Sequence, residues 1–203
     1  MIHADESGKL VRNCRHKMAY HRRHPKVRET KATSIKNRVS IHERPIEADG
    51  KRFGDWGMDL VVDSNSNAIL TMVERSTNYL LMAKLKEGKK SMPLAKTVWR
   101  LLLPYKGRTF RTITTDNGSD FAAHEWIMDK LGVAVFFTDA YCSWQKGTVE
   151  NANKLIRKYI PKKANFDEFS HKRIMNIQKK LNRRPREKLN FDTPINCFFK
   201  TFH

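Results

Sequence analysis

Residues 56–85 have the sequence WGMDLVVDSNSNAILTMVERSTNYLLMAKL, from which the centre of the fold can be predicted. Branched apolar residues make three segments strand-like, at 56–63, 68–75 and 79–85. The connecting segments, SNSN and STN, consist of residues whose side chains hydrogen-bond to nearby backbone and so favour turns. Three strands joined by two short turns predict an antiparallel meander.

After residue 85 the pattern alternates between helices and strands. An apolar helical face runs through 92–105, and we expect further elements in the order strand 108–115, helix 119–132, strand 133–137, helix 148–160 and helix 167–185, before a tail at 190–199. This order predicts an α/β protein with a mixed five-stranded sheet flanked by helices, which is the order of the RNase H-like fold. In that fold the first and fourth strands would be neighbours near the sheet centre.

Basic residues are concentrated towards both ends of the chain. The formal net charge is +19, of which residues 1–44 carry +8, residues 45–150 carry +1 and residues 151–203 carry +10. Lys and Arg release counterions when they meet phosphates, so this distribution indicates a nucleic-acid partner. Charge alone also fits a solvated basic surface or binding to RNA. We predict a basic N-terminal arm over 1–45 and a core over 46–203 with a basic C-terminal helix and tail.

The apolar runs are far too short to span a membrane, and the N-terminus lacks the apolar stretch of a signal peptide. We therefore expect a cytoplasmic protein without a membrane partner, associated with the nucleoid when it binds DNA.

The cysteines do not suggest a disulfide framework, because they are odd in number and far apart: Cys14, Cys142 and Cys197. One cluster contains residue types that bind zinc, namely Cys14, His16, His21 and His24. Its spacing fits no standard zinc finger, and five Lys and Arg residues within and beside it would repel a cation. A basic arm facing nucleic acid is the favoured interpretation.

Three carboxylates are candidates for a metal-binding catalytic site. Asp59 lies within the first predicted strand, Asp116 follows the fourth, and Glu150 is in the first turn of a predicted helix. Each also has an ordinary interpretation: a solvated strand face, an Asx turn and a favourable interaction with the helix dipole. The predicted fold would bring all three together, where they repel one another unless cations neutralise them. Two Mg²⁺ or Mn²⁺ ions about 3.5–4 Å apart could then act on a phosphodiester.

The predicted helix at 148–160 supports this interpretation through its two faces. Its polar face carries residues at i, i+3, i+4 and i+7, namely Glu150, Asn153, Lys154 and Arg157. Its other face is apolar and can pack on the sheet: Val149, Ala152, Ile156 and Tyr159. The acid therefore shares its face with side chains that suit phosphate contacts.

Three stretches are specific enough to resemble a known family: TITTDNGSDFAAH (112–124), SWQKGTVENANKLIRKYIPK (143–162) and LNRRPREKLNFDTP (181–194). The chain resembles the DDE transposases of bacterial insertion sequences, specifically the IS-thirty family, whose catalytic core is similar to retroviral integrase. The resemblance covers about residues 35–200, and the 33 residues between Asp116 and Glu150 match the family pattern. There are departures: the family's usual Glu before the first acid is missing, Val149 replaces an Asn and Lys154 replaces a Gly.

The resemblance implies that Asp59, Asp116 and Glu150 are the catalytic, metal-binding triad. Asn117 and Gly118 would shape the loop beside the metals. The residues expected to bind DNA, some of them by positioning the triad, are Trp144, Gln145, Lys146, Asn151, Asn153, Lys154, Arg157, Arg183, Arg184 and Arg186. Core packing is the alternative for Trp144, and a solvated surface is the alternative for the arginines.

The implied function is that of a transposase catalysing metal-dependent cleavage and strand transfer of an insertion sequence, that is, DNA transposition, integration and recombination. Its partners would be element-end DNA, target DNA and further copies of itself. Family members normally carry an N-terminal helix-turn-helix region, and we expect this chain to begin downstream of it, with the arm as remnant linker. The alternative is a catalytically silent truncated transposase that acts only as a DNA-binding protein. The specific motifs argue against an RNA-binding protein.

Overall fold

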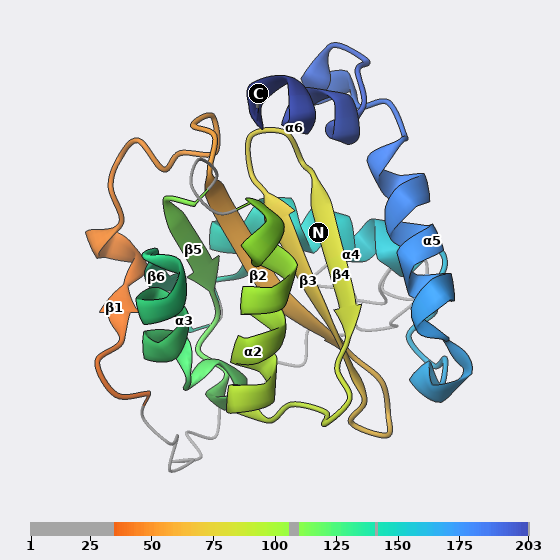
Figure 1. Cartoon of the computed structure of the whole chain (residues 1–203), viewed down its shortest axis with the longest axis horizontal. Coiled ribbons are helices and arrows are strands. Elements are labelled where there is room, and N and C mark those ends of the chain that lie inside the picture. The colour runs from red at the N-terminus through yellow and green to blue at the C-terminus, as the bar shows by residue number, and fades with distance from the viewer. Residues whose placement is uncertain (1–34, 106–109, 141, 203) are drawn as a thin grey trace, which may run out of the picture. The chain divides into compact units, whose positions relative to one another are not determined.

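The computed structural model describes residues 35–105, 110–140 and 142–202, which all lie in one compact unit, Thr33–His203 (Figure 1). The zinc alternative for the sequence around Cys14 concerns residues outside these ranges, as does most of the predicted arm. The boundary between arm and core stays a prediction.

A mixed sheet forms the centre of this unit, with the strand order β1-β6-β5-β2-β3-β4. The strands are β1 (Val39–Ser40), β2 (Asp55–Val62), β3 (Ala68–Glu74), β4 (Leu80–Lys84), β5 (Thr112–Thr115) and β6 (Ala134–Phe137). The predicted antiparallel meander is confirmed as β2-β3-β4, and β5, β6 and β1 extend the sheet through parallel pairs. The predicted fold class is confirmed with six described strands instead of five. β1 was missed because two residues carry no periodic signal.

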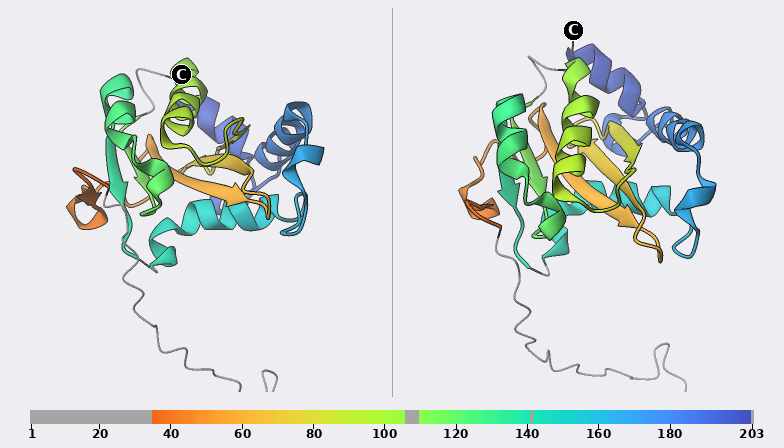
Figure 2. Two further views of the ribbon diagram at one scale, coloured as in Figure 1. Left: turned by 90° about the horizontal axis from the view of Figure 1, so that it is seen from below. Right: turned by 60° about the horizontal axis from the view of Figure 1, so that its bottom comes forward.

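Helices cover both faces of the sheet. They are α2 (Ser91–Leu102), α3 (His124–Leu131), α4 (Gly147–Ile156), α5 (His171–Asn182) and α6 (Pro194–Phe202). Short 3-10 helices also occur: η2 (Ile41–Glu43), η3 (Leu103–Tyr105), η4 (Ser119–Phe121), η5 (Ser143–Lys146), η6 (Phe166–Glu168) and η7 (Glu187–Leu189). Figures 1 and 2 show α2 and α3 on one face and α4 across the other. Within the described ranges, no helix has the length and apolar character needed to cross a membrane.

Four predictions about helices differ from the structure. α4 ends at Ile156 instead of residue 160, and the predicted tail forms α6. The helix predicted over 119–132 is divided into η4 and α3, and the helix predicted over 167–185 is divided into η6 and α5, which ends at Asn182. The carboxylate of Asp192 stabilises the start of α6, because it accepts hydrogen bonds from the Thr193 backbone N–H and the Asn196 side chain. Phe198 is fully buried and stacks on Tyr79 with 4.2 Å between ring centroids.

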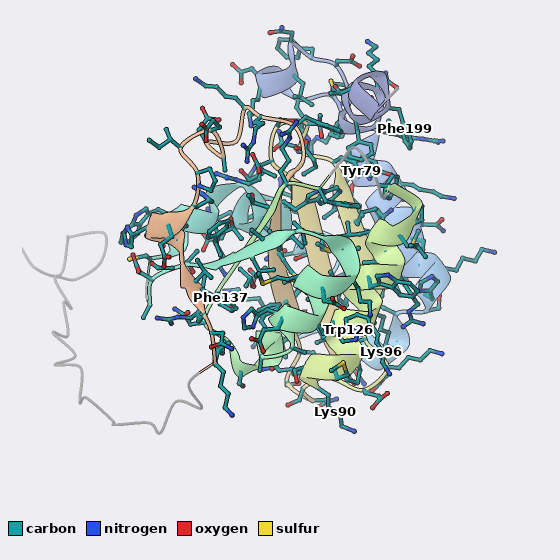
Figure 3. The ribbon with its side chains drawn as sticks, turned by 60° about the vertical axis from the view of Figure 1, so that its left-hand side comes forward. Tyr79, Lys90, Lys96, Trp126, Phe137 and Phe199 are labelled. Carbon is teal, nitrogen blue, oxygen red and sulfur yellow. The ribbon has the colours of Figure 1, made fainter. Side chains whose placement is uncertain are left out.

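Aromatic packing therefore holds α6 against the strands. Figure 3 shows Phe199, the next residue of α6, beside Tyr79, and their ring centroids are 6.0 Å apart. The helix in the tail depends on these tertiary contacts, so the local sequence pattern did not reveal it.

The edge strand β4 is protected by α5. The side chain of Asn182 accepts from the Leu80 N–H and donates to the Leu80 carbonyl, both at 2.8 Å, and Gln178 accepts from the Met82 N–H at 2.7 Å. Side chains of α5 thereby satisfy backbone groups that would otherwise be exposed for pairing with another strand.

The alternation of side chains between the two faces of the sheet determines on which face of β2 Asp59 lies. Trp56 and Met58 belong to the core cluster that includes α2, whereas Val61 belongs to the cluster that includes α4 and α5. Successive side chains of a strand point to opposite faces, so Asp59 shares the face of Val61, beneath α4.

Candidate active site

Parallel pairing of β2 and β5 brings two of the predicted acids together. Asp55, Trp56 and Gly57 of β2 pair with Thr112, Ile113 and Thr114 of β5. Continued by two residues, this register places Asp59 alongside Asp116, which directly follows β5. The prediction that the first and fourth predicted strands are neighbours near the sheet centre is thus confirmed, because they are β2 and β5, which pair directly.

The side chain of Lys146 lies between these two carboxylates. Its Nζ is 3.0 Å from Asp116 Oδ2 and 3.4 Å from Asp59 Oδ1. The Lys146 side chain is only 9% exposed, compared with 17% for Asp59 and 40% for Asp116. The buried ammonium of Lys146 is therefore shared by an acid of β2 and the acid that directly follows β5.

Neutral donors hold the other sides of the carboxylates. The Asn153 amide donates to Asp59 Oδ2 at 2.9 Å, and the Leu60 N–H donates to Asp59 Oδ1 at 2.9 Å. The Gly118 N–H donates to Asp116 Oδ1 at 3.0 Å. These donors give both carboxylates defined orientations.

The loop after Asp116 also requires a small residue. A Cβ at Gly118 would lie 3.1 Å from Asp116 Oδ1, so a side chain there would crowd the carboxylate. Asn117 fastens the same loop, since it donates to the Thr138 carbonyl and accepts from Arg38 at 2.6 Å. The expectation that Asn117 and Gly118 shape the loop beside the acids agrees with these contacts.

Burial and charge both act on the ionisation of this cluster. Burial raises the pKa of Asp59 above its usual value, with Lys146 opposing and Asp116 reinforcing the rise. Burial alone would lower the pKa of Lys146, but the nearby charges of Asp59 and Asp116 outweigh it and the pKa is raised. The arrangement thus favours a charged ammonium between the acids.

α4 carries the third predicted acid, Glu150, in its first turn. The helix lies close to β2, because a Cβ at Gly57 would be only 3.3 Å from Val149 Cβ. Glu150 follows Val149 directly, is partly buried, and shares a helical face with Asn153, which reaches Asp59. The close packing of α4 on Gly57 therefore determines how near the helix face that carries Glu150 and Asn153 lies to β2.

The acids provide ligands suited to a divalent cation. Carboxylate and amide oxygens are the ligands that Mg²⁺ and Mn²⁺ prefer. Asp59 and Asp116 already share one cation, and the Oδ1 of Asn153 is buried with no hydrogen-bond partner among the described residues. Across the described ranges, no three His, Cys, Asp or Glu side chains converge as a ready-made metal site. Asp59, Asp116 and the Asn153 Oδ1 are donors that fit a metal, whereas the structure does not bring Glu150, on the adjoining helix face, into one group with the two aspartates.

The predicted DNA-binding residues divide into two groups: side chains that are exposed to solvent, and side chains that form hydrogen bonds within the protein. Trp144 is 72% exposed, so the alternative of core packing is excluded for it. Others are also exposed: Asn151, Lys154, Arg183 and Arg184. These five side chains are accessible to a partner molecule.

The side chains of the second group form hydrogen bonds to other parts of the protein. Gln145 donates to Asp139 Oδ2 and accepts from the Asp139 N–H, which closes the loop ahead of α4. Arg157 donates to the Val62 and Pro161 carbonyls, and burial lowers its pKa. Together with Lys146 and Asn153, these residues hold the site in position, a role that residue type alone does not reveal.

Arg186 and Asn151 line a surface hollow of about 350 Å³ beside the start of α4. Its other lining residues were not selected from the sequence: Asn78, Gly147, Thr148, Glu187 and Lys188. Arg186 donates to the Leu181 carbonyl through one terminal nitrogen, while its Nε is buried without a hydrogen-bond partner in the described part of the chain. The long-range approach of residue 186 to α4 had no sequence signal.

Two further buried carboxylates have structural roles. Asp55 accepts from Arg52 at 2.9 and 3.0 Å and from Thr112 at 2.7 Å. Glu74, which pairs with Trp56 across β2 and β3, accepts from the backbone N–H groups of Gly54 and Thr77. Their hydrogen-bonding needs are met by these neighbours, so we assign them to stability.

No protein-family model matches the chain. The sequence is nevertheless similar to "Transposase for insertion sequence element IS4351" from Bacteroides fragilis, with 44% identity over 166 residues, which cover 81% of this chain and 50% of that protein. It is also 34% identical over 180 residues to "Transposase InsI for insertion sequence element IS30A" from Escherichia coli K12, covering 88% of this chain and 47% of the relative. The chain thus spans about half the length of the curated relatives it matches.

Among solved structures, the fold resembles the catalytic core domain of BIV integrase, with a TM-score of 0.58 and 19% identity. The match covers 74% of this chain and 96% of that domain. At this identity the likeness concerns the fold alone, and it confirms the predicted integrase-like fold class. Sequence identity of 34% and 44% over most of this chain confirms the predicted resemblance to the IS30-type transposases of insertion sequences.

Proposed function

We propose that this chain carries the catalytic core of a transposase that cleaves and joins DNA, with Asp59, Asp116 and Glu150 as the metal ligands. The observation that carries the proposal is the meeting of Asp59 and Asp116 around one buried cation. Two acids from adjacent strands are thereby held where a divalent cation could bind both. The family's transposase names and the integrase-like fold support the same activity.

Mg²⁺ or Mn²⁺, two ions in the active complex, would supply activation of the attacking oxygen and stabilisation of the leaving oxygen at a phosphodiester. The chain's own residues provide the geometry. Asn153 and the Leu60 N–H orient Asp59, and the Gly118 N–H orients Asp116. Glu150 adds the third carboxylate from α4.

DNA, as element ends and as target, would lie across the face that carries η5 and α4. Trp144 offers an exposed aromatic ring, and Lys154 offers an exposed cation on the Glu150 face. Arg183 and Arg184, at the end of α5, add positive charge for phosphate contacts. Proteins that hold two element ends need two sites, so we expect a homo-oligomer on DNA.

The test is cleavage and strand transfer on labelled DNA carrying the element ends, with Mg²⁺ or Mn²⁺. Asp116→Asn removes one ligand, and Asp129→Asn, an exposed acid on α3, is the matched control. We expect metal-dependent products from the unmodified chain and from Asp129→Asn, and none from Asp116→Asn. If no variant cleaves while all bind DNA, the chain is a silent DNA-binding protein and the proposal is wrong.

A further inference from the structure

Lys146 occupies an unusual position for a residue expected to hold DNA. It ends η5, directly before α4, and its ammonium points inward between Asp59 and Asp116 instead of towards solvent. With only 9% of its side chain exposed, it is less accessible than either acid.

The contacts of the two carboxylates show what the ammonium contributes. Asp59 Oδ2 and Asp116 Oδ1 each accept from a neutral donor, Asn153 and the Gly118 N–H respectively. The positive charge of Lys146 faces the other two oxygens, namely Asp116 Oδ2 and Asp59 Oδ1, and the latter also accepts from the Leu60 N–H. Neighbouring carboxylates repel one another unless a cation neutralises them, and an ammonium is a compact point charge suited to that position.

A divalent cation bound by both aspartates needs oxygens of the same two carboxylates. An ammonium and a metal ion would repel each other there, so one must leave before the other binds. We propose that Lys146 is the internal counter-ion of the Asp59–Asp116 pair in the metal-free protein, and that a divalent metal displaces it from the pair. This inference rests on the metal-binding role of the two acids proposed above.

Displacement has a consequence for the DNA-facing surface. Lys146 lies two residues after the exposed Trp144, and a Cβ placed on the neighbouring Gly147 would meet no described residue within 4 Å other than its chain neighbours and its own helix backbone. The chain at this junction is therefore uncrowded on that side, and a displaced ammonium joins the surface beside Trp144. Metal loading would convert a buried positive charge into one available to a phosphate.

The first experiment measures Mn²⁺ affinity of the full metal-free chain by calorimetry, without DNA. Lys146→Met keeps the length of the side chain and removes its charge, whereas Lys158→Met alters an exposed lysine just after α4. We expect Lys146→Met to bind Mn²⁺ about tenfold more tightly, the scale of one charge-assisted hydrogen bond that no longer has to be broken. Lys158→Met and the conservative Lys146→Arg should bind like the unmodified chain. Equal or weaker binding by Lys146→Met overturns the proposal.

A second experiment uses the unmodified chain, so it does not depend on how a variant folds. Amine-labelling rates of individual lysines are measured by mass spectrometry with EDTA and with saturating Mn²⁺. Lys146 should react slowly in EDTA and severalfold faster with Mn²⁺, whereas Lys84, which donates to the Phe166 carbonyl at 2.8 Å, should not change. An unchanged or slower reaction of Lys146 contradicts displacement.

The two proposals fail in different ways. Mn²⁺ binding that Asp116→Asn abolishes, but that Lys146→Met leaves unchanged, overturns the role of Lys146 and retains the metal site. Mn²⁺ binding that is absent, or indifferent to Asp116→Asn, overturns both.

Discussion

The side-chain amide of Asn153 donates a 2.9 Å hydrogen bond to Asp59 Oδ2, which joins α4 to the central strand β2. The two residues are 94 positions apart in the chain. This bond fixes the orientation of a partly buried acid and locates the face of α4 that also carries Glu150. A residue that hydrogen-bonds to a metal ligand usually affects metal affinity. If Asp59 is such a ligand, replacing Asn153 should therefore have a measurable effect.

Asn153→Ala should reduce the rate of metal-dependent cleavage about 10- to 100-fold, since Asp59 loses the donor that orients it. Asn176→Ala, on the exposed side of α5, is the matched control. Cleavage rates and Mn²⁺ affinity are measured together with thermal unfolding. Full activity in Asn153→Ala would show that the Leu60 N–H suffices to position the acid.

Gly57→Ala should destabilise the protein by about 1–3 kcal/mol, because the added Cβ meets Val149 Cβ at 3.3 Å in a packed interface. Gly147→Ala is the control, since its Cβ would meet no described residue within 4 Å apart from its chain neighbours and its own helix, and its φ is helical. Chemical denaturation gives both free energies of unfolding. Val149→Gly removes the contacted Cβ, so the steric explanation predicts that it recovers part of the loss in the double variant, and a purely additive result would argue against it.

Trp144→Ala should weaken binding of single-stranded DNA without changing the unfolding temperature, because this ring is exposed and does not belong to the core. Loss of one stacked base corresponds to about 1–3 kcal/mol, or roughly 5- to 150-fold in affinity. Fluorescence anisotropy measures the affinity, with Ile46→Ala as a second exposed apolar truncation. Equal losses in both variants would mean that exposed apolar area in general, and not stacking by Trp144, contributes.

Asp192 should make the stability of the C-terminal region depend on pH. Hydrogen bonds from Lys200, then from Asn196 and the Thr193 N–H, lower the pKa of Asp192 from 3.8 to about 2. Since the folded value lies below the unfolded one, the ionised carboxylate stabilises the fold above about pH 4, and this contribution is lost as the pH falls towards 2.

Asp192→Asn should therefore lower the unfolding temperature at pH 6, and the difference from the unmodified chain should shrink as the pH approaches 2. Thermal scans across this range test it, with Asp129→Asn as an exposed acid for comparison. A difference that stays constant with pH would show that the charge of Asp192 does not stabilise α6.

Much of the architecture followed from local patterns. Apolar runs separated by turn residues located β2, β3 and β4, and the glycine after α3 adopts the left-handed conformation of a helix stop at residue 132, with φ 66°. The positions of Asp59 and Asp116 on neighbouring strands followed from the strand order and are confirmed by the register. These features depend on short-range chemistry, which the sequence carries directly.

Other features depended on contacts between distant segments. β1 forms because Val39 meets Phe136 of β6, and α6 forms where Phe198 reaches Tyr79. Neither segment has a periodic signal strong enough to indicate its structure. The side-chain bonds from α5 that cover the backbone of β4 are equally invisible before the fold is known.

The sequence by itself determined the order of β2 to β6 and of α2 to α5, the resemblance to insertion-sequence transposases and the acids proposed for the candidate site, because periodicity, turn residues and motif spacing are local properties of the chain. Only the tertiary structure decided which cations face those acids and which face solvent. Lys146 and Lys154 are eight positions apart and chemically identical, yet one is buried between Asp59 and Asp116 and the other is exposed on α4. The direction of a long, flexible side chain depends on the charges that the fold places around it, and these come from strands distant in the sequence.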